Sequence, residues 1–417
     1  MCVRWALSPA NLGPATRMPK TTGSTGPRED TRLIRAGQSA TPDAKTVGPS
    51  VQKGSTVLLP DAASLYDDGG RLTYGRQGLS AQFALREALA ELEHAKAVSL
   101  YPSGIASITG PLLAVLKAGD EVLVTDAIYK PTRRFCDHVL KRFGVGVRYF
   151  DPRQEPEALV GEASEATRLV LMESPGSLSF EVQDVGRVAE LARARRILTV
   201  ADNTWGAGYL HRPLDHGVDI SVQALTKYVA GHSDVFMGSA AVNDPRLSQA
   251  LEDGVHDLGW AVAGEEAYQV LRGLRTLPTR LARQGDSGLT VAAWLRERPE
   301  VAQVFHPGLP DALDHELWRR DYTGACGLFG FSLRPGPEAA VNAFLDALQL
   351  FGLGFSWGGF ESLAISCDPQ LKVRKFRPDY GGPLIRLHIG LENPHDLIAD
   401  LARGLEIYTA KAGLAWR

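Results

Sequence analysis

Cysteine is scarce in this sequence, charge is balanced, and long apolar runs are missing. The four cysteines in 417 residues form no CxxC pair, so we expect no disulfide framework, no metal site and a reducing cytoplasm. The 45 Lys and Arg residues against 48 Asp and Glu leave a net charge of −3, which disfavours binding to nucleic acid or an anionic membrane. No apolar run reaches the about 18 residues of a membrane span.

The remaining composition is that of a folded protein, with 44% hydrophobic and 22% charged residues. A chain of 417 residues predicts two or three domains. Residues 1–28 differ from the rest, because they are rich in Pro, Gly, Ser and Thr and contain no apolar block of the kind that a secretory signal requires. We expect a flexible extension there, and Met18 is an alternative start to Met1.

Helical segments alternate with short apolar runs, which predicts a mostly parallel α/β sheet. After a helix at 81–92, the expected strands are 97–101, 121–125, 145–150, 168–173, 197–201 and 220–223, with a further one at 236–242. A helical stretch at 264–281, interrupted at Pro278, then leads away from the sheet. We expect a second, smaller α/β domain from about residue 274 to the end, with strands at 327–333 and 384–389.

Polar residues that directly follow the apolar runs are the candidates for a ligand site, because open α/β sheets bind ligands at the carboxyl ends of their strands. Gly104 and Ile105 open a helix, and their free backbone N–H groups can hold a phosphate. A tight turn capped by Ser103 gives the same pattern. Tyr129 follows the second run, where its ring can cover a flat cofactor or simply pack.

Two charged residues end later runs. Burial of the Asp202 carboxylate is costly unless a cation or a hydrogen-bond donor pairs with it, and a helix cap can also be that donor. Burial of Lys227 disfavours its ammonium form and leaves an amine available for a Schiff base, although a lysine that reaches solvent from a loop has the same sequence pattern. The two residues are 25 positions apart, about one strand–helix–strand step, so both can face one pocket.

Taken together, these groups match the contacts that pyridoxal 5′-phosphate (PLP) requires. Backbone donors suit its phosphate, an aromatic ring suits its pyridine face, a carboxylate suits the ring nitrogen, and a lysine suits the aldehyde. A Schiff-base aldolase requires only the lysine. A Rossmann dehydrogenase requires GxGxxG near its first strand, and the sequence has none there.

Several motifs resemble the Cys/Met-metabolism enzymes that use PLP. They are Tyr74-Gly75-Arg76, Ser103-Gly104, Glu173-Ser174-Pro175-Gly176, Asp202-Asn203-Thr204-Trp205, residues 223–228 with Gly231-His232-Ser233-Asp234, and residues 385–392. Within that family, Phe355-Ser356-Trp357-Gly358-Gly359-Phe360-Glu361-Ser362 resembles the bacterial cystathionine β-lyases. The likeness extends from about residue 30 to the end of the chain.

The resemblance implies a PLP-dependent transferase of fold type I, assembled as a homotetramer. Its implied parts are a flexible extension (1–28), an arm that contacts a neighbouring subunit (29–77), a PLP-binding domain (78–273) with a mostly parallel seven-stranded sheet, and a smaller C-terminal α/β domain (274–417).

The resemblance also implies roles for individual residues. The cofactor residues are Tyr74, Arg76, Gly104, Ile105, Tyr129, Asp202, Thr226 and Lys227. Lys227 forms the Schiff base, Asp202 pairs with the ring nitrogen, Tyr129 stacks on the ring, and the others hold the phosphate. Tyr74 and Arg76 come from the neighbouring subunit, and Lys227 and Tyr129 are the catalytic residues. The substrate residues are Ser356, Trp357 and Arg386, with Arg386 binding the carboxylate.

The sequence departs from the family at two phosphate positions. Many relatives have Met at Ile105 and Ser at Ala224, so we expect one side-chain contact to the phosphate to be missing, whereas backbone donors remain. His232 and His388 lie in matching motifs, and we expect core histidines with satisfied rings. A solvated or inter-subunit helix face is expected for Arg272, Arg275 and Arg280.

The activity implied by the resemblance is α,β-elimination of L-cystathionine to homocysteine, pyruvate and ammonia, in methionine biosynthesis. Phe355 and Trp357 predict aromatic walls that favour the cysteinyl end of the substrate, although both rings can equally be packing. The alternatives are γ-elimination by a cystathionine or methionine γ-lyase, γ-replacement by a homoserine-derivative sulfhydrylase, and a regulatory protein that binds PLP without turnover.

Overall fold

Two sheets, each covered by helices, make up the part of the chain that the computed structural model describes, which is residues 27–37, 46–66 and 72–414. The predicted extension lies almost wholly outside these ranges. The strands of the first sheet are β1 (Ala97–Tyr101), β2 (Glu121–Thr125), β3 (Gly146–Phe150), β4 (Thr167–Glu173), β5 (Leu198–Asp202), β6 (Ile220–Gln223) and β7 (Gly238–Val242). Their order is β1-β7-β6-β5-β4-β2-β3, and only β7 runs antiparallel to its neighbours. The predicted mostly parallel, seven-stranded sheet is therefore confirmed.

Both faces of this sheet are buried, which explains why its strands are continuous apolar runs. In β4, Leu169 and Leu171 join the core on the side of α3 (Gly104–Val115) and α7 (Pro245–Asp257). Val170 and Met172, which alternate with them, join the core on the side of α5 (Pro156–Gly161) and α6 (Val185–Ala194). Because successive side chains point to opposite faces, one run of apolar residues supplies both layers.

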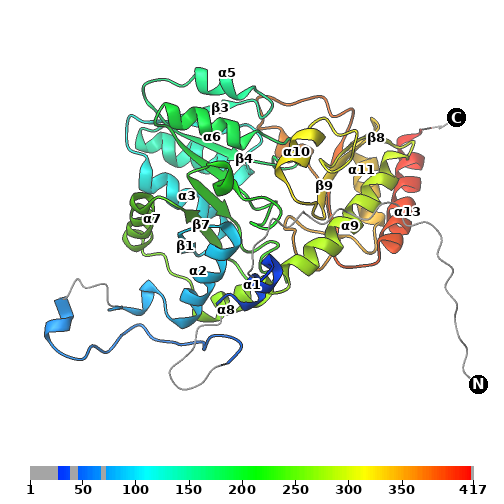
Figure 1. The fold of residues 1–417 in the computed structure, drawn as a ribbon. Coiled ribbons are helices and arrows are strands. Elements are labelled where there is room, and N and C mark those ends of the chain that lie inside the picture. Colours follow the sequence, from blue (N-terminus) through cyan, green and yellow to red (C-terminus); the bar gives the residue numbers. More distant parts are fainter. Residues whose placement is uncertain (1–26, 38–45, 67–71, 415–417) are drawn as a thin grey trace, which may run out of the picture.

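The second sheet is smaller and mostly antiparallel. Its strands, in spatial order, are β10 (Gly352–Leu353), β11 (Leu363–Ser366), β12 (Leu384–His388), β9 (Leu328–Leu333) and β8 (Val301–Phe305). Helices α9 (Leu277–Arg296), α11 (Glu338–Ala347) and α13 (Pro394–Ala412) pack on it, at the right of Figure 1. The two predicted strands of this region are confirmed as β9 and β12.

The predicted helix at 264–281 is two helices, and the break does not lie at Pro278. Helix α8 (Gly264–Leu274) ends two residues before α9 begins, and Pro278 occupies the first turn of α9. A proline is well tolerated there because the first-turn N–H groups have no partner within a helix. In Figure 1, α9 runs from the first sheet toward the second, so it connects the two regions.

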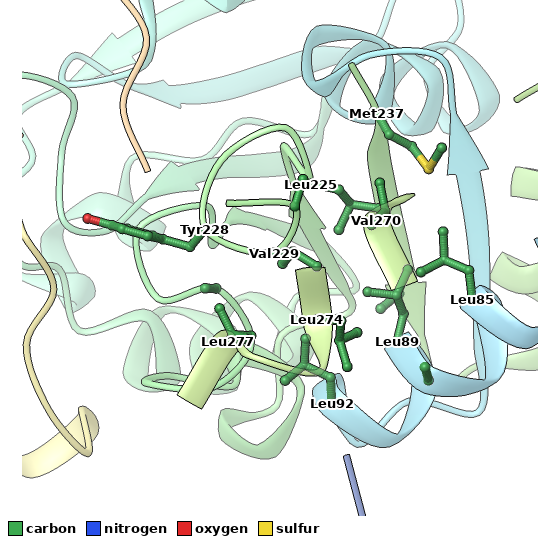
Figure 2. Packing of buried hydrophobic residues seen from close by; sticks show 14 of the residues in the cluster. Leu85, Leu89, Leu92, Leu225, Tyr228, Val229, Met237, Val270, Leu274 and Leu277 are labelled. Atoms are coloured by element: carbon green, nitrogen blue, oxygen red, sulfur yellow. The ribbon is translucent and has the colours of Figure 1, made fainter. Parts of the chain in front are cut away.

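A core cluster lies between the first sheet and the helices α2 (Ser80–Glu93) and α8. Figure 2 shows side chains of both helices packed against residues that flank Lys227 in the chain. Tyr228 and Leu225 are fully buried there, and Val229 is 1% exposed. The segment that carries Lys227 is therefore held by a packed core.

Part of the described arm, which includes Ala63–Tyr66, extends away from both sheets, whereas its first helix packs on α2 (Figure 1). Its short elements are α1 (Glu29–Arg35) and two 3₁₀ turns, Ala63–Tyr66 and Gly75–Gln77. Tyr66 and Leu58 are each 91% exposed. None of the helices in the described ranges combines the length and apolar character needed to cross a membrane.

Candidate active site

A cavity of about 410 Å³ lies at the carboxyl ends of β4, β5 and β6 and is closed on one side by residues of the second sheet region. The predicted site residues that line it are Gly104, Ile105, Tyr129, Asp202, Thr226, Lys227, Ser356, Trp357 and Arg386. The structure therefore brings together residues that are up to 282 positions apart, from Gly104 to Arg386. Their individual roles stay predictions.

Lys227 lies in the turn that follows β6, and its amine reaches the segment after β10. Its Nζ donates a hydrogen bond to Ser356 Oγ at 3.0 Å and lies 5.3 Å from the ring centroid of Trp357. Burial lowers the pKa of Lys227 to about 8, and the positive charge of Arg386 acts in the same direction, whereas Asp202 opposes them. An amine that loses its proton near neutral pH can act as a nucleophile and as a base.

Asp202 ends β5 and is 7% exposed. Its Oδ1 accepts hydrogen bonds from the Thr204 N–H at 3.0 Å and the Thr204 hydroxyl at 2.5 Å. Among the described residues, no hydrogen bond reaches Oδ2. Burial raises the pKa of Asp202, while the Thr204 bonds and the charge of Lys227 lower it. A cationic group at Oδ2 would offset the cost of burial, which fits a protonated ring nitrogen.

A second carboxyl, the partly buried Glu173, lines the cavity, and its role is not predicted from the sequence. Glu173 ends β4, and its Cα is paired with that of Asp202 on the neighbouring strand. Its Oε2 accepts a hydrogen bond from the Tyr129 N–H at 2.6 Å. Burial, reinforced by the charge of Asp202, raises the pKa of Glu173 well above its ordinary value. Its place at a strand end, inside a quoted motif, was the signal in the sequence.

Tyr129 lies directly before α4 (Lys130–Phe135), and its bond to Glu173 fixes its backbone at the cavity wall. The side chain is 43% exposed, so one side of the ring is open. Burial of the hydroxyl raises its pKa, and the charges of Glu173 and Asp202 add to this effect. Tyr129 therefore keeps its proton at neutral pH.

The start of α3 has the free backbone donors on which the phosphate prediction rests. Ser103 caps the helix, with its Oγ accepting from the Ala106 N–H at 3.2 Å. A Cβ on Gly104 would lie 2.4 Å from the Cβ of Ala224, so only glycine allows this approach. The N–H groups of Gly104 and Ile105 lie in the first turn, where a helix has no internal partners for them and favours an anion.

The side chains near the start of α3 offer few free donors for a phosphate. Ala224 lines the cavity without a hydroxyl, as the departure from the family pattern implied. The Thr226 hydroxyl also lines it, but donates to the Met237 carbonyl at 3.2 Å and accepts from the Met237 N–H at 3.0 Å. In this arrangement the hydroxyl is engaged with the backbone of its neighbour.

Arg386 lies on β12 and is 5% exposed. Its Nη atoms donate to the carbonyls of Gly354, Phe355 and Ser356 at 2.9–3.1 Å. Among the described residues, its buried Nε has no hydrogen-bond partner. Burial lowers the pKa of Arg386 to about 10, so it remains a cation at neutral pH. A cation with an unused donor at a cavity suits a substrate carboxylate.

Tyr74 and Arg76 do not line the cavity of their own chain. Tyr74 is 48% exposed and forms an isolated β-bridge with Thr56. The Arg76 Nη1 donates to the His256 carbonyl at 2.8 Å, near the end of α7. Their contribution to a neighbouring subunit's site stays a prediction.

The two histidines differ from each other. His388 is buried, with Nδ1 3.0 Å from the Glu361 carbonyl oxygen, but Nε2 has no partner among the described residues. Burial lowers its pKa to about 3, which keeps the ring neutral. The expectation of a core residue was wrong for His232, which is exposed and has Nδ1 2.7 Å from the Ala230 carbonyl oxygen.

The prediction for the helix-face arginines was wrong for Arg280. Arg272 is exposed, but the Arg280 guanidinium is buried within its own chain and donates to three backbone carbonyls.

The donor set fits PLP on this chain's own observations. A buried carboxylate has a free oxygen, a lysine amine has a lowered pKa, and a helix start has a glycine that allows close approach. Within the described ranges no three His, Cys, Asp or Glu side chains are placed to hold a metal ion.

Comparison with known proteins gives a consistent result. Residues 30–406 match the family model described as Cys/Met metabolism PLP-dependent enzyme. The chain is 41% identical to the cystathionine β-lyase of Bordetella avium, covering 86% of this chain and 91% of that protein. It is 40% identical to cystathionine β-lyase MetC of Escherichia coli, covering 90% and 97%. A solved cystathionine γ-synthase from Xanthomonas oryzae pv. oryzae superposes with a TM-score of 0.86 at 32% identity, covering 93% and 100%.

Proposed function

Because the chain belongs to the Cys/Met-metabolism family of PLP-dependent enzymes, we propose that it cleaves L-cystathionine by α,β-elimination to homocysteine, pyruvate and ammonia. The observation that carries the proposal is the placement of the Lys227 amine beside Ser356, Trp357 and Arg386 in one cavity. The γ-synthase relative keeps γ-chemistry as the alternative, because the cofactor residues serve both reactions.

Residues of three kinds would hold the cofactor. Lys227 would bond to its aldehyde carbon, Asp202 would accept from its ring nitrogen, and the N–H groups at the start of α3 would bind its phosphate. Tyr129 would cover one face of the ring. Bound PLP supplies an electron sink for the pair released at the substrate Cα.

The chain's own groups bind the substrate and move its protons. Arg386 binds the α-carboxylate through its guanidinium, which fixes the orientation of Cα. Lys227 Nζ removes the Cα proton, because its lowered pKa leaves a larger fraction of the amine unprotonated near neutral pH than an ordinary lysine has. The Cβ–S bond then breaks with its electron pair on sulfur. Tyr129 Oη, which keeps its proton, donates to the leaving thiolate, and water releases pyruvate and ammonia.

Selectivity for the β-carbon is attributed to the walls of the cavity. Phe355 and Trp357 both line it, beside the carboxylate-binding Arg386. Trp357 is held edge-to-face against the ring of Tyr228, at 5.4 Å between centroids, whereas Phe355 is 78% exposed. A fixed wall restricts the depth of substrate entry, and one methylene of difference is worth about 1–3 kcal/mol in such a pocket. We therefore propose that the cysteinyl end of cystathionine binds next to Lys227.

The product spectrum with L-cystathionine tests the proposal. The expected products of the holoenzyme are pyruvate and homocysteine. Formation of 2-oxobutyrate and cysteine instead would replace the β-lyase assignment with a γ-lyase. In Trp357→Ala, we expect a changed ratio of these products or a changed preference among β-substituted amino acids. An unaltered substrate and product profile would show that Trp357 has only a packing role.

We also infer a homotetramer with shared sites and a cytoplasmic location. The extended arm that carries Tyr74 and Arg76 supports sharing, since neither residue reaches its own cavity. Within the described ranges three cysteines have free thiols, which supports a reducing compartment, and they are Cys136, Cys326 and Cys367. Light scattering would test the assembly, and fractionation of the source cell would test the location.

A further inference from the structure

Helix α9 contacts both halves of the candidate active site, through two buried polar side chains one turn apart. Arg280 is 6% exposed and Gln284 is fully buried. Residues at i and i+4 lie on the same face of a helix, so both side chains extend from the same side of α9. Each is hydrogen-bonded to backbone of the segments that supply the site.

Arg280 holds the turn that carries the catalytic lysine. Its Nη1 donates to the Tyr228 carbonyl at 2.7 Å, and its Nη2 donates to the Val229 carbonyl at 3.2 Å. Nη2 also donates to the Gly273 carbonyl at 2.8 Å, and Nε donates to the Thr276 hydroxyl at 3.1 Å. Every nitrogen of the guanidinium is therefore used, and the two residues directly after Lys227 are fixed.

The fit between this turn and the guanidinium leaves no space for another side chain. Gly231 has φ +70°, and a Cβ there would lie 2.0 Å from Arg280 Nη1. All four acceptors are uncharged oxygens, and burial lowers the pKa of Arg280 to about 10, so a cation is kept in the interior at neutral pH. Burial of the Arg280 charge among uncharged oxygens costs free energy. Its hydrogen bonds to these oxygens in turn fix the geometry of the lysine turn.

Gln284 holds the opposite half of the site. Its Nε2 donates to the Gly359 carbonyl at 2.7 Å, in the loop that carries Ser356 and Trp357. The two halves also meet directly, because a Cβ on Gly358 would lie 3.0 Å from the Lys227 Cα. Ser233, after the lysine turn, donates from its hydroxyl to Glu361 at 2.6 Å.

We propose that Arg280 and Gln284 are positioning residues, which hold the lysine turn (227–231) and the substrate loop (356–359) in register with each other from one face of α9. The hydrogen bond between Lys227 Nζ and Ser356 Oγ is the contact whose alignment depends on both. The inference rests on the proposed function for its kinetic readout and is independent of it for its spectroscopic one.

The test uses purified holoenzyme with Arg280→Lys, Arg280→Met and Gln284→Met. Arg272→Met is the matched control, because Arg272 is exposed on the neighbouring helix. Lysine keeps the charge but offers a single nitrogen where arginine has a fork of donors. Without substrate, the readouts are the visible absorbance and circular dichroism of bound PLP and the fraction of Lys227 trapped by borohydride. With L-cystathionine, they are kcat and KM.

We expect Arg280→Lys and Gln284→Met each to change the visible dichroism and to lower kcat on the order of 10- to 100-fold, because a misplacement of about 1 Å has that effect. KM should change less than kcat. The double variant should lose no more than the worse single one, since both act on one alignment. Arg272→Met should match the wild type in every readout.

Unchanged dichroism with unchanged kcat in the folded variants would overturn the inference, as would a loss of rate that only follows a loss of folded protein. If Arg280→Met does not fold, Arg280→Lys and Gln284→Met give the decision. A wild type that does not cleave cystathionine, with variants that still alter the dichroism, would refute the proposed function and leave the positioning role intact.

Discussion

Lys227 combines the two conditions that make a lysine reactive, which are burial and a nearby cation. Its pKa of about 8 results first from burial and then from Arg386. Lys227→Ala removes the base and the cofactor's covalent attachment, so we expect a loss of at least about 10²- to 10⁴-fold in turnover of cystathionine, measured as pyruvate formed. Lys411→Ala, on the exposed surface of α13, is the control. Near-normal rates in the Lys227 variant would refute the assignment.

Glu93 is a buried acid that the proposed reaction does not use. It ends α2, is 1% exposed, and accepts hydrogen bonds from the side chains of Ser221 and Gln223 on β6. Burial raises its pKa from 4.5 to about 7, against the effect of these two bonds. Between these values the unfolded chain releases the proton and the folded chain keeps it, so the contribution of Glu93 to stability falls as the pH rises through this window.

Glu93→Gln removes this pH dependence. The shift of Glu93 corresponds to about 3 kcal/mol at its full extent. We expect the variant to match the wild type in free energy of unfolding at about pH 4, below the unfolded pKa, and to exceed it by up to that amount at about pH 8, measured with urea. Glu87→Gln, on the exposed face of the same helix, should show no such change. A constant difference between variant and wild type would show that Glu93 does not titrate in this range.

Single residues also mark the limit of prediction from sequence. Asp202 and Lys227 were found because Asp202 lies at the end of a strand and Lys227 in the turn after the next strand, and strand ends meet at one edge of a parallel sheet. Glu173 ends a strand as well, but an acid in that position does not by itself indicate a role. Its pairing with Asp202 on the neighbouring strand is visible only in the structure. Arg280 was misplaced because its partners are backbone carbonyls, which any sequence provides.

Among the elements, α3 makes the closest contact with a neighbouring segment at the site. A Cβ at Gly104 would meet the Cβ of Ala224 at 2.4 Å, so Gly104→Ala must move the start of the helix away from the turn of Lys227. We expect PLP to bind at least about tenfold more weakly, because the backbone N–H groups of the first turn would no longer point toward its phosphate. The measurement is the dissociation constant of PLP, obtained from its absorbance or from fluorescence quenching.

Gly161→Ala is the matched control for this prediction. Gly161 is the last residue of α5, and a Cβ there would meet nothing within 4 Å. Alanine is a better helix former than glycine by about 0.5–1 kcal/mol, so this variant should be as stable as the wild type or more so, with unchanged affinity for PLP. Equal affinities in both variants would show that the start of α3 does not hold the cofactor.

Elements were predicted best where burial covers both faces. The strands of the first sheet lie within two residues of their predicted bounds, because continuous apolar runs leave little choice of register. The break before α9 was misplaced, since the sequence has a proline at 278 but the chain leaves the helix after Leu274. Tertiary packing decides such boundaries, and Gly273 packs tightly enough on Ala230 that a Cβ would lie 2.1 Å from its carbonyl oxygen.

At the scale of the whole molecule, a buried charge network ties the two sheet regions together. The Asp126 carboxylate, after β2, accepts from the backbone N–H groups of Lys375 and Phe376 at 3.1 and 2.8 Å. Arg374 lies between Asp126 and Glu181, at 3.4 and 3.1 Å from their carboxylates. These partners are about 190 to 250 positions apart, so no local pattern reveals them. Asp126 of this network lies close in sequence to Tyr129. The network therefore links the arrangement of the two sheet regions to the candidate active site.

Sharing of sites between subunits is the largest-scale prediction, because it concerns residues that do not line the cavity of their own chain. Tyr74 and Arg76 lie outside the cavity, whereas Lys227 lies within it. If the arm completes a neighbour's site, each site takes Lys227 from one chain and Arg76 from the other. Arg76→Ala and Lys227→Ala are then each inactive, because every site lacks one of the two residues. Mixing the two variants then creates dimers in which one site has both residues intact and the other has neither.

Random exchange of subunits between Arg76→Ala and Lys227→Ala should therefore restore about a quarter of the wild-type activity per site. The experiment mixes the purified variants, dissociates and reassembles them, and follows pyruvate formation from cystathionine, with mass spectrometry to prove that hybrids have formed. Each variant treated alone is the control. The donor in trans must be Arg76 for rescue to occur, because a residue acting within its own chain would leave every hybrid site defective. Proven hybrids without activity would place Arg76 in a role confined to its own chain, such as its bond to the His256 carbonyl.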